Sequence, residues 1–318
     1  MFIIKLPSRV YENNYKDYLK LISEGNGHSH IRIDFQDVTY LTPLTTIFLI
    51  TKIYEWNKSS QVVDFINFTT CNAFKYLQRM NFFSLCGITL DEDFLRHSSK
   101  GKFVEIKSVR NSDIGELSTE IAECIAPELK DEIDSKKLGF FNCIEYSISE
   151  LGNNIVQHAQ STNSFVNAQY TEYKDLIRVA IIDNGIGIKE SFFVNNSPHK
   201  DFINSHLDAI NKALEIETSS KTHLNIWGES SNAGVGLTLL KSIAEKIQGD
   251  FIIFSGNGYY SLEEQELFEE NLSFNGTLCS FTFKRTDIQD FNTLLFEIKK
   301  DIGLIPALPI IEQEGLFI

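Results

Sequence analysis

Apolar and polar residues alternate with different periods along the first hundred residues, and each period predicts an element. Residues 31–38 (IRIDFQDV) alternate in the manner of a half-buried strand, and residues 62–68 (VVDFINF) form a second such run. Apolar residues at helical spacing follow each of them, in a segment that begins near Pro43 and in residues 72–83. This strand–helix–strand–helix order predicts a small α/β domain with a largely parallel sheet over residues 1–98.

A short polar stretch with glycine, HSSKGK at 97–102, separates this region from a second one. Residues 103–286 predict a strand, two helices and further strands, in the order of an α/β sandwich with one mixed sheet and helices on one face. The expected helices lie near 112–130 and 136–160, and the expected strands at 102–109, 163–171, 177–183, 250–255 and 277–284. Residues 287–318 predict an amphipathic helix and an apolar tail, which either cap their own domain or pack on another chain.

Composition narrows the class of protein. A length of 318 residues suggests about two domains, and a formal net charge of −14 argues against a nucleic-acid or anionic-membrane surface. The 5 cysteines are scattered without a C-x-x-C pair, which fits neither a disulfide framework nor a zinc site. No apolar run reaches the ~20 residues of a membrane span. We therefore expect a soluble, cytoplasmic protein.

Four short motifs in the second region follow one another in order. Glu150, Asn154 and His158 recur every fourth residue, so they share one face of a helix. The run DNGIGI at 183–188 follows an apolar strand, GVGL at 234–237 precedes an amphipathic helix, and NGT at 275–277 opens a strand. The second motif is not the Rossmann fingerprint, because Glu190 stands where the third glycine would lie, and no P-loop sequence occurs.

In series, these motifs resemble those of the GHKL (Bergerat) ATP-binding fold, shared by gyrase, MutL, sensor histidine kinases and the anti-sigma-factor serine kinases. The anti-sigma kinases are the most similar type. The resemblance covers residues 103–286 and implies that the chain binds ATP and Mg²⁺.

The resemblance assigns a role to each matching residue. Glu150 would be the general base that activates the nucleophile, and Asn154 would offer one carbonyl oxygen to Mg²⁺. Asp183 would accept a hydrogen bond from the adenine amino group, which selects ATP over GTP. The remaining expected nucleotide contacts are Gly185 and Gly187 beside the base, Gly234 and Gly236 at the phosphates, and Thr277 at the adenine.

Some 45 residues between Ile188 and Gly234 stand where the family keeps its ATP lid, and they include a predicted helix at 200–216. Lys221 in this segment either reaches a phosphate or lies unpaired on the surface. His158 matches the last position of the first motif in the anti-sigma kinases, with helix packing as the alternative.

The first region resembles a STAS domain, the fold of anti-sigma-factor antagonists. Its loop TYLTPLTT lacks the family's Asp-Ser-Ser-Gly element, and Pro43 or Leu44 stands where the phosphorylated serine would be. Thr42, Thr45 and Thr46 are nearby hydroxyls, but we expect them to cap the helix and lie on its surface rather than to be phosphorylated. We interpret this domain as a docking or scaffold module.

The sequence thus predicts a Mg-ATP-binding regulator that acts through nucleotide-dependent protein contacts and phosphorylates a partner protein on serine or threonine. Two alternatives stay open. One is a slow ATPase whose lid closure drives homodimerisation, and the other is a module that binds ATP without turnover. A sensor histidine kinase is disfavoured, since no phosphoacceptor-histidine hairpin precedes the motifs. The partner protein is not identified by the sequence.

Overall fold

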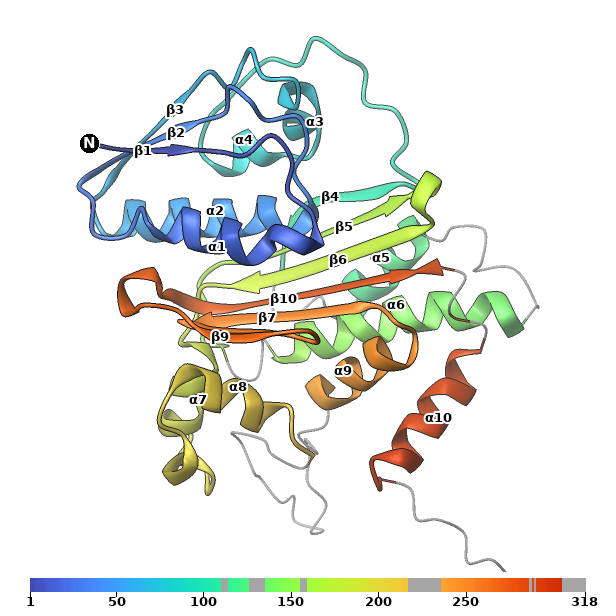
Figure 1. The fold of residues 1–318 in the computed structure, drawn as a ribbon. Coiled ribbons are helices and arrows are strands. Elements are labelled where there is room, and N and C mark those ends of the chain that lie inside the picture. The colour runs from blue at the N-terminus through green and yellow to red at the C-terminus, as the bar shows by residue number, and fades with distance from the viewer. Residues whose placement is uncertain are drawn as a thin grey trace, which may run out of the picture.

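The computed structural model describes residues 1–109, 114–125, 135–154, 159–216, 236–285, 288 and 290–304. Its strands form a small and a large sheet (Figure 1). The small sheet is parallel with the order β1-β2-β3, which confirms the parallel sheet predicted for the first region. Its strands are β1 (Phe2–Lys5), β2 (His30–Asp34) and β3 (Val62–Ile66).

The helices around the small sheet are η1 (Glu12–Asn14), α1 (Tyr15–Ser23), α2 (Pro43–Lys58), α3 (Phe74–Arg79) and α4 (Phe82–Leu85). Helix α2 begins with a proline in its first turn, directly after Thr42, as predicted. The single helix predicted at 72–83 is wrong. Asn81 adopts a left-handed conformation with φ of 64°, which asparagine tolerates better than most residues, and it separates α3 from α4.

The large sheet has seven strands in the order β4-β5-β6-β10-β7-β8-β9. They are β4 (Phe103–Ser108), β5 (Ser164–Thr171), β6 (Leu176–Asp183), β7 (Asp250–Gly256), β8 (Gly258–Ser261), β9 (Gln265–Leu267) and β10 (Phe274–Lys284). Every neighbouring pair is antiparallel, so the predicted mixed sheet is wrong. The helical crossover from β6 to β7 leaves those two strands parallel, but β10 lies between them and pairs antiparallel with both.

The second region contributes the helices α5 (Ile114–Ile125), α6 (Ser135–Asn154), α7 (Gly187–Val194), α8 (His206–Ala213), α9 (Gly236–Lys246) and α10 (Phe291–Asp301), and the short turns η4 (Glu172–Lys174), η5 (Lys200–Phe202) and η6 (Glu270–Leu272). Helices α5, α6 and α9 cover one face of the large sheet and share a core with it. Helix α10 packs on α6 and α9 through Phe291 and Ile298, so it covers its own chain. None of the described helices has the length and apolarity that crossing a membrane requires.

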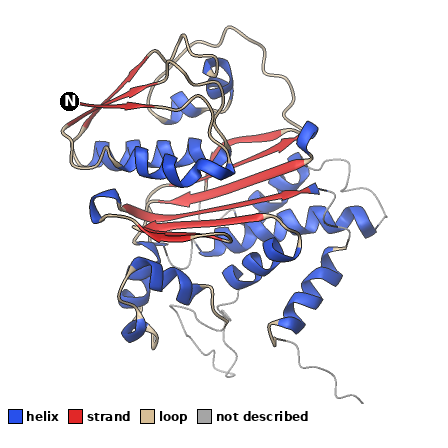
Figure 2. Cartoon of the chain, in the orientation of Figure 1, coloured by secondary structure: helices blue, strands red, loops and turns tan. Residues whose placement is uncertain are grey.

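The other face of the large sheet is covered by α2, which belongs to the first region (Figure 2). Phe48 of α2 contacts Phe254 and Phe274 edge-on, and both phenylalanines point from the large sheet into the shared core. Helix α2 also contacts β3 of the small sheet, so it lies between the two sheets. A helix that is covered on two sides has to be apolar around most of its circumference. This explains why the four consecutive residues 47–50 (IFLI) are all apolar and buried.

Polar contacts, one of them buried, join the two regions as well. The Arg178 guanidinium on β6 is 2% exposed and pairs with the Glu12 carboxylate of η1. At the far edges of the sheet, Lys16 pairs with Glu264 at 2.6 Å, and Arg79 pairs with Glu105 of β4. A buried charge is tolerated only when it is paired, so the contact of Arg178 with Glu12 favours one relative placement of the two regions.

Candidate nucleotide-binding site

The described residues of the four sequence motifs lie on elements that meet at one end of the large sheet, on the face covered by α5, α6 and α9. Strand β6 ends and β10 begins at this end, on the left in Figure 1. Glu150 and Asn154 are in the last turns of α6, and Asp183 ends β6. Gly236 begins α9. Thr277 lies directly opposite Asp183 in the β6–β10 pairing. The first and last of these residues are separated by more than a hundred positions in the sequence, and only the sheet and its crossover helices bring them together.

The Asp183 carboxylate is buried, with the residue 2% exposed. It accepts hydrogen bonds from the backbone amides of Gly185, at 2.8 Å, and of Thr277. Burial raises the pKa of this carboxyl group from 3.8 to about 7, and the two amide hydrogen bonds oppose the rise. A desolvated carboxylate of this kind is a strong acceptor for the hydrogen-bond donor of a ligand.

This raised pKa makes the stability of the protein depend on pH. Because the folded-state pKa lies above the unfolded value, the contribution of Asp183 to stability is fully present below about pH 4 and is lost as the pH rises through 7. Between the two pKa values the loss is roughly 1.4 kcal/mol per pH unit. We expect Asp183→Asn to remove this pH dependence. The free energy of unfolding of the variant should therefore increase relative to that of the native protein between pH 5 and pH 7. Urea unfolding at several pH values measures this difference, and a pH-independent difference would contradict it.

Two glycines allow backbone and side chains to approach closely in this site. A Cβ atom at Gly185 would lie 1.9 Å from the carbonyl oxygen of Ala159, so only glycine fits beside the chain that follows α6. At Gly236, a Cβ would lie 2.3 Å from Oε2 of Glu150. The first turn of α9 therefore lies directly against the Glu150 carboxylate, and the backbone amides at a helix N-terminus favour anions.

Glu150 is partly buried, and this burial raises the pKa of its carboxyl group, while the positive charge of Lys299 on α10 lowers it. A raised pKa suits a general base, because it brings proton affinity closer to neutral pH. Asn154 lies one turn further along α6, and its buried amide nitrogen makes no hydrogen bond within the described part of the chain. The oxygen of the same amide is the type of ligand that Mg²⁺ takes.

The residues present fit a magnesium ion only in part. Among the described residues, no three His, Cys, Asp or Glu side chains are grouped so that they could hold a metal. One amide oxygen is a weak ligand alone, so an ion at Asn154 would take its other ligands from phosphate and water, as Mg²⁺ commonly does.

Sequence reasoning did not single out Ser255 at the end of β7, which is 1% exposed. Its hydroxyl donates to the carbonyl of Gly276 at 2.8 Å and accepts from the amide of Ile188 at 3.0 Å. Ser255 thereby connects the DNGIGI turn to the NGT motif, next to Gly187. A single serine at a strand end carries no signal in the sequence that would have revealed this role.

Several predicted residues lie outside the described part of the chain. They are His158, Lys221, Gly234 and the segment 217–235 of the expected lid. The first part of that region contains α7, which starts within the DNGIGI motif, and α8. Helix α8 is shorter than the helix predicted at 200–216, because Ser205 and Asp208 form a capping box that starts it at His206.

Thr42 is the N-cap of α2, as predicted, although its side chain makes no capping hydrogen bond. The three threonines at the start of α2 are fully buried, so the helix-surface position expected for them is wrong. The Thr45 hydroxyl donates to the carbonyl of Thr42 at 2.8 Å, and the Thr46 hydroxyl donates to that of Pro43 at 2.9 Å. Helix α2 and α6 lie on opposite faces of the large sheet. The sheet therefore separates these hydroxyls from Glu150.

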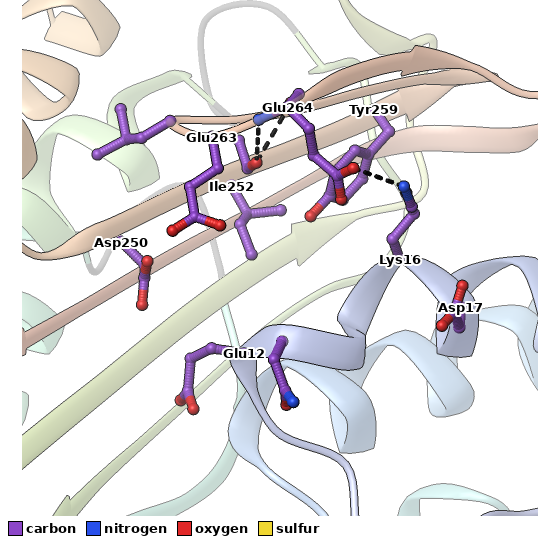
Figure 3. A pocket seen from close by; sticks show the side chains of 11 residues that line it. Glu12, Lys16, Asp17, Asp250, Ile252, Tyr259, Glu263 and Glu264 are labelled. Atoms are coloured by element: carbon purple, nitrogen blue, oxygen red, sulfur yellow. Dashed lines mark hydrogen bonds and ion pairs between the residues drawn. The ribbon is translucent and has the colours of Figure 1, made fainter.

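A separate open cavity of about 510 Å³ lies between the start of α1 and the β7–β8 hairpin (Figure 3). Its walls carry five carboxylates and one lysine, Lys16, which pairs with Glu264. The pKa of Asp250 in this wall is raised mainly by burial and, to a smaller extent, by repulsion from the carboxylates of Glu12 and Glu263. A triphosphate is highly anionic, so this cavity repels the ligand that the motif residues suit.

Comparisons with models of protein families, with curated protein sequences and with solved structures returned no match. The function is therefore inferred from the site residues and their arrangement alone.

Proposed function

We propose that this chain is a GHKL-type regulatory protein that binds Mg-ATP and transfers the terminal phosphoryl group to a serine or threonine hydroxyl of a partner protein. One observation carries the proposal. The Glu150 carboxylate and the first turn of α9 touch at Gly236, at the same end of the sheet where Asp183 meets Thr277. A base, an anion-binding helix terminus and a buried purine acceptor thus occur together, as phosphoryl transfer from ATP requires.

Each residue has a role in this proposal. Asp183 accepts a hydrogen bond from the adenine amino group, with Thr277 beside it. The amides that begin α9, at Gly236, bind phosphate oxygens. Asn154 holds Mg²⁺, which would neutralise phosphate charge when bound. Glu150 takes the proton from the attacking hydroxyl and orients it.

The receiving hydroxyl belongs to another molecule in this proposal. Thr42, Thr45 and Thr46 are 0% exposed and lie across the large sheet from Glu150, which argues against these three hydroxyls as the acceptors. The buried position of α2 supports a scaffold role for the first region, whose contacts with the large sheet are already made.

Incubation with ATP labelled on its γ-phosphate, with and without a cell lysate, tests the proposal. We expect a labelled partner protein with the native chain and none with Glu150→Gln. Free phosphate without labelled protein would indicate an ATPase, and bound ATP without turnover would indicate a binding module. Failure of the native chain to bind ATP would overturn the proposal.

The role of Asn154 makes a separate prediction. We expect Asn154→Ala to weaken ATP binding only when Mg²⁺ is present, because the lost oxygen contacts the ion and not the nucleotide. Calorimetric titrations with Mg²⁺ and with a chelator measure both affinities. Equal losses under the two conditions would contradict a ligand role for Asn154.

A further inference from the structure

Strand β10 contains an irregularity beside the candidate site. Its pairing with β7 shifts between Phe274 and Thr277, so Asn275 and Gly276 bulge out of the regular ladder. Gly276 has a φ of 125°, and a Cβ there would lie 2.0 Å from the carbonyl oxygen of Asp183. The bulge is therefore in direct contact with the residue that ends β6, and its position affects where the Thr277 amide lies.

A residue of the first region holds this bulge. Oε1 of Glu55, on α2, accepts a hydrogen bond from the backbone amide of Asn275 at 2.8 Å. The Glu55 side chain is only 12% exposed, so water competes little for this amide. Two residues further along β10, the Thr277 amide donates to the Asp183 carboxylate. A short, nearly continuous path thus runs from α2 to the buried acceptor of the site.

Glu55 is itself held from behind. Lys52, one turn earlier on α2 and 2% exposed, pairs with it at 2.6 Å and also donates to Oδ1 of Asn26 at 2.7 Å. The amide nitrogen of Asn26 donates to the carbonyls of Asn271 and Ser273, at 2.8 and 2.9 Å. The same partly buried network therefore holds the segment that leads into the bulge and the carboxylate that caps it.

We propose that Glu55 is a positioning residue for the nucleotide site: by holding the Asn275 amide, it sets the bulge that places Thr277 and Asp183 against the adenine. This inference rests on the proposed function. It means that both regions of the chain build the site. A partner that displaces α2 would consequently lower the affinity for ATP without touching the nucleotide.

The test uses two full-length variants that differ in one acceptor atom. Lys52→Met combined with Glu55→Gln keeps an oxygen that can accept from Asn275, whereas Lys52→Met combined with Glu55→Met has none. Neither variant leaves an unpaired charge in the core, which would be strongly destabilising. Calorimetry gives the Kd for ATP and for inosine triphosphate, which differs only in its purine edge. Amide exchange of residues 275–277 is followed without nucleotide.

We expect the glutamine variant to keep the native preference for ATP. In the methionine variant we expect the preference for ATP over inosine triphosphate to fall about tenfold, which corresponds to the loss of one hydrogen bond. The backbone amides of residues 275–277 should also exchange faster in this variant. Arg79→Ala serves as a control, because Arg79 also joins the two regions and is 13% exposed, but it contacts Glu105 at β4. It should leave the preference unchanged.

The outcomes separate the two proposals. If the native chain binds ATP and the two double variants show equal preference and equal exchange, the role of Glu55 is overturned while the proposed function stands. If Arg79→Ala lowers the preference as much as the methionine variant does, general loosening explains the effect and the role is again overturned. If the native chain binds no ATP, the proposed function fails, and this inference fails with it.

Discussion

Replacing Asp183 with alanine is expected to raise the Kd for ATP roughly 30- to 150-fold, which corresponds to about 2 to 3 kcal/mol. The physical reason is an asymmetry. In the native site the adenine amino group would exchange water for a buried carboxylate, but in the variant it would be buried without an acceptor. The amides of Gly185 and Thr277 also lose their partner, so part of the effect comes from a less ordered site. Calorimetric titration of both proteins with ATP measures the change.

Asp183→Asn provides the control for this prediction. It retains an oxygen for the two backbone amides, but its amide nitrogen can donate to the carbonyl of guanine. The native carboxylate cannot donate once it is ionised, so the titrations are made above pH 7. The native protein should prefer ATP to GTP, and this variant should reduce or reverse the preference. Equal affinities of the native protein for the two nucleotides would rule out Asp183 as the adenine-reading residue.

Glu150→Gln is expected to lower turnover by about 10²- to 10⁴-fold, the usual contribution of a general base, while leaving the Kd for ATP almost unchanged. The substitution preserves the shape against which Gly236 packs, so it removes proton affinity and little else. Phosphoryl transfer to protein or water is measured with labelled ATP, and binding is measured separately.

Glu145→Gln is the matched control on the same helix. Glu145 accepts from the Thr119 hydroxyl at 2.6 Å and so connects α6 to α5 instead of facing α9. Its turnover should equal that of the native protein. Native turnover in the Glu150 variant would exclude Glu150 as the base, and a matching loss in the Glu145 variant would point to a disturbed helix.

The strands and the motif positions were predictable because they depend on local patterns. The run LIRVAIID is apolar except for Arg178 and the final Asp183, and it forms β6, a strand covered on both faces. The aspartate and glycines at its end predicted a turn, which the structure contains; a Cβ at Gly185 would meet the Ala159 carbonyl there, and the place of Gly185 and Gly187 beside the base stays a prediction. The spacing of Glu150 and Asn154 placed both in consecutive turns of α6. These features need only the residues near them in the sequence.

The order and direction of the strands in the large sheet were not predictable in the same way. A strand, a helical crossover and another strand predict a parallel neighbour, but β10 takes the position between β6 and β7. Strand pairing depends on which long-range contacts bury the most apolar surface. The local sequence of β10 does not indicate with which strands it will pair. The contacts of Ser255 and Glu55 depend on this pairing, so they were missed with it.

By itself, the sequence determined a small parallel α/β region, a second region with helices on one face of a sheet, and a set of residues whose chemistry suits a nucleotide. It did so because helix and strand periodicity, caps and glycine turns are local properties. Only the tertiary structure decided that α2 lies between two sheets and that its Glu55 reaches the β10 bulge. The apolar face of the large sheet had to be covered, and α2, apolar around most of its surface, covers it. That packing brings a residue of the first region into hydrogen-bond contact with a motif more than two hundred positions away.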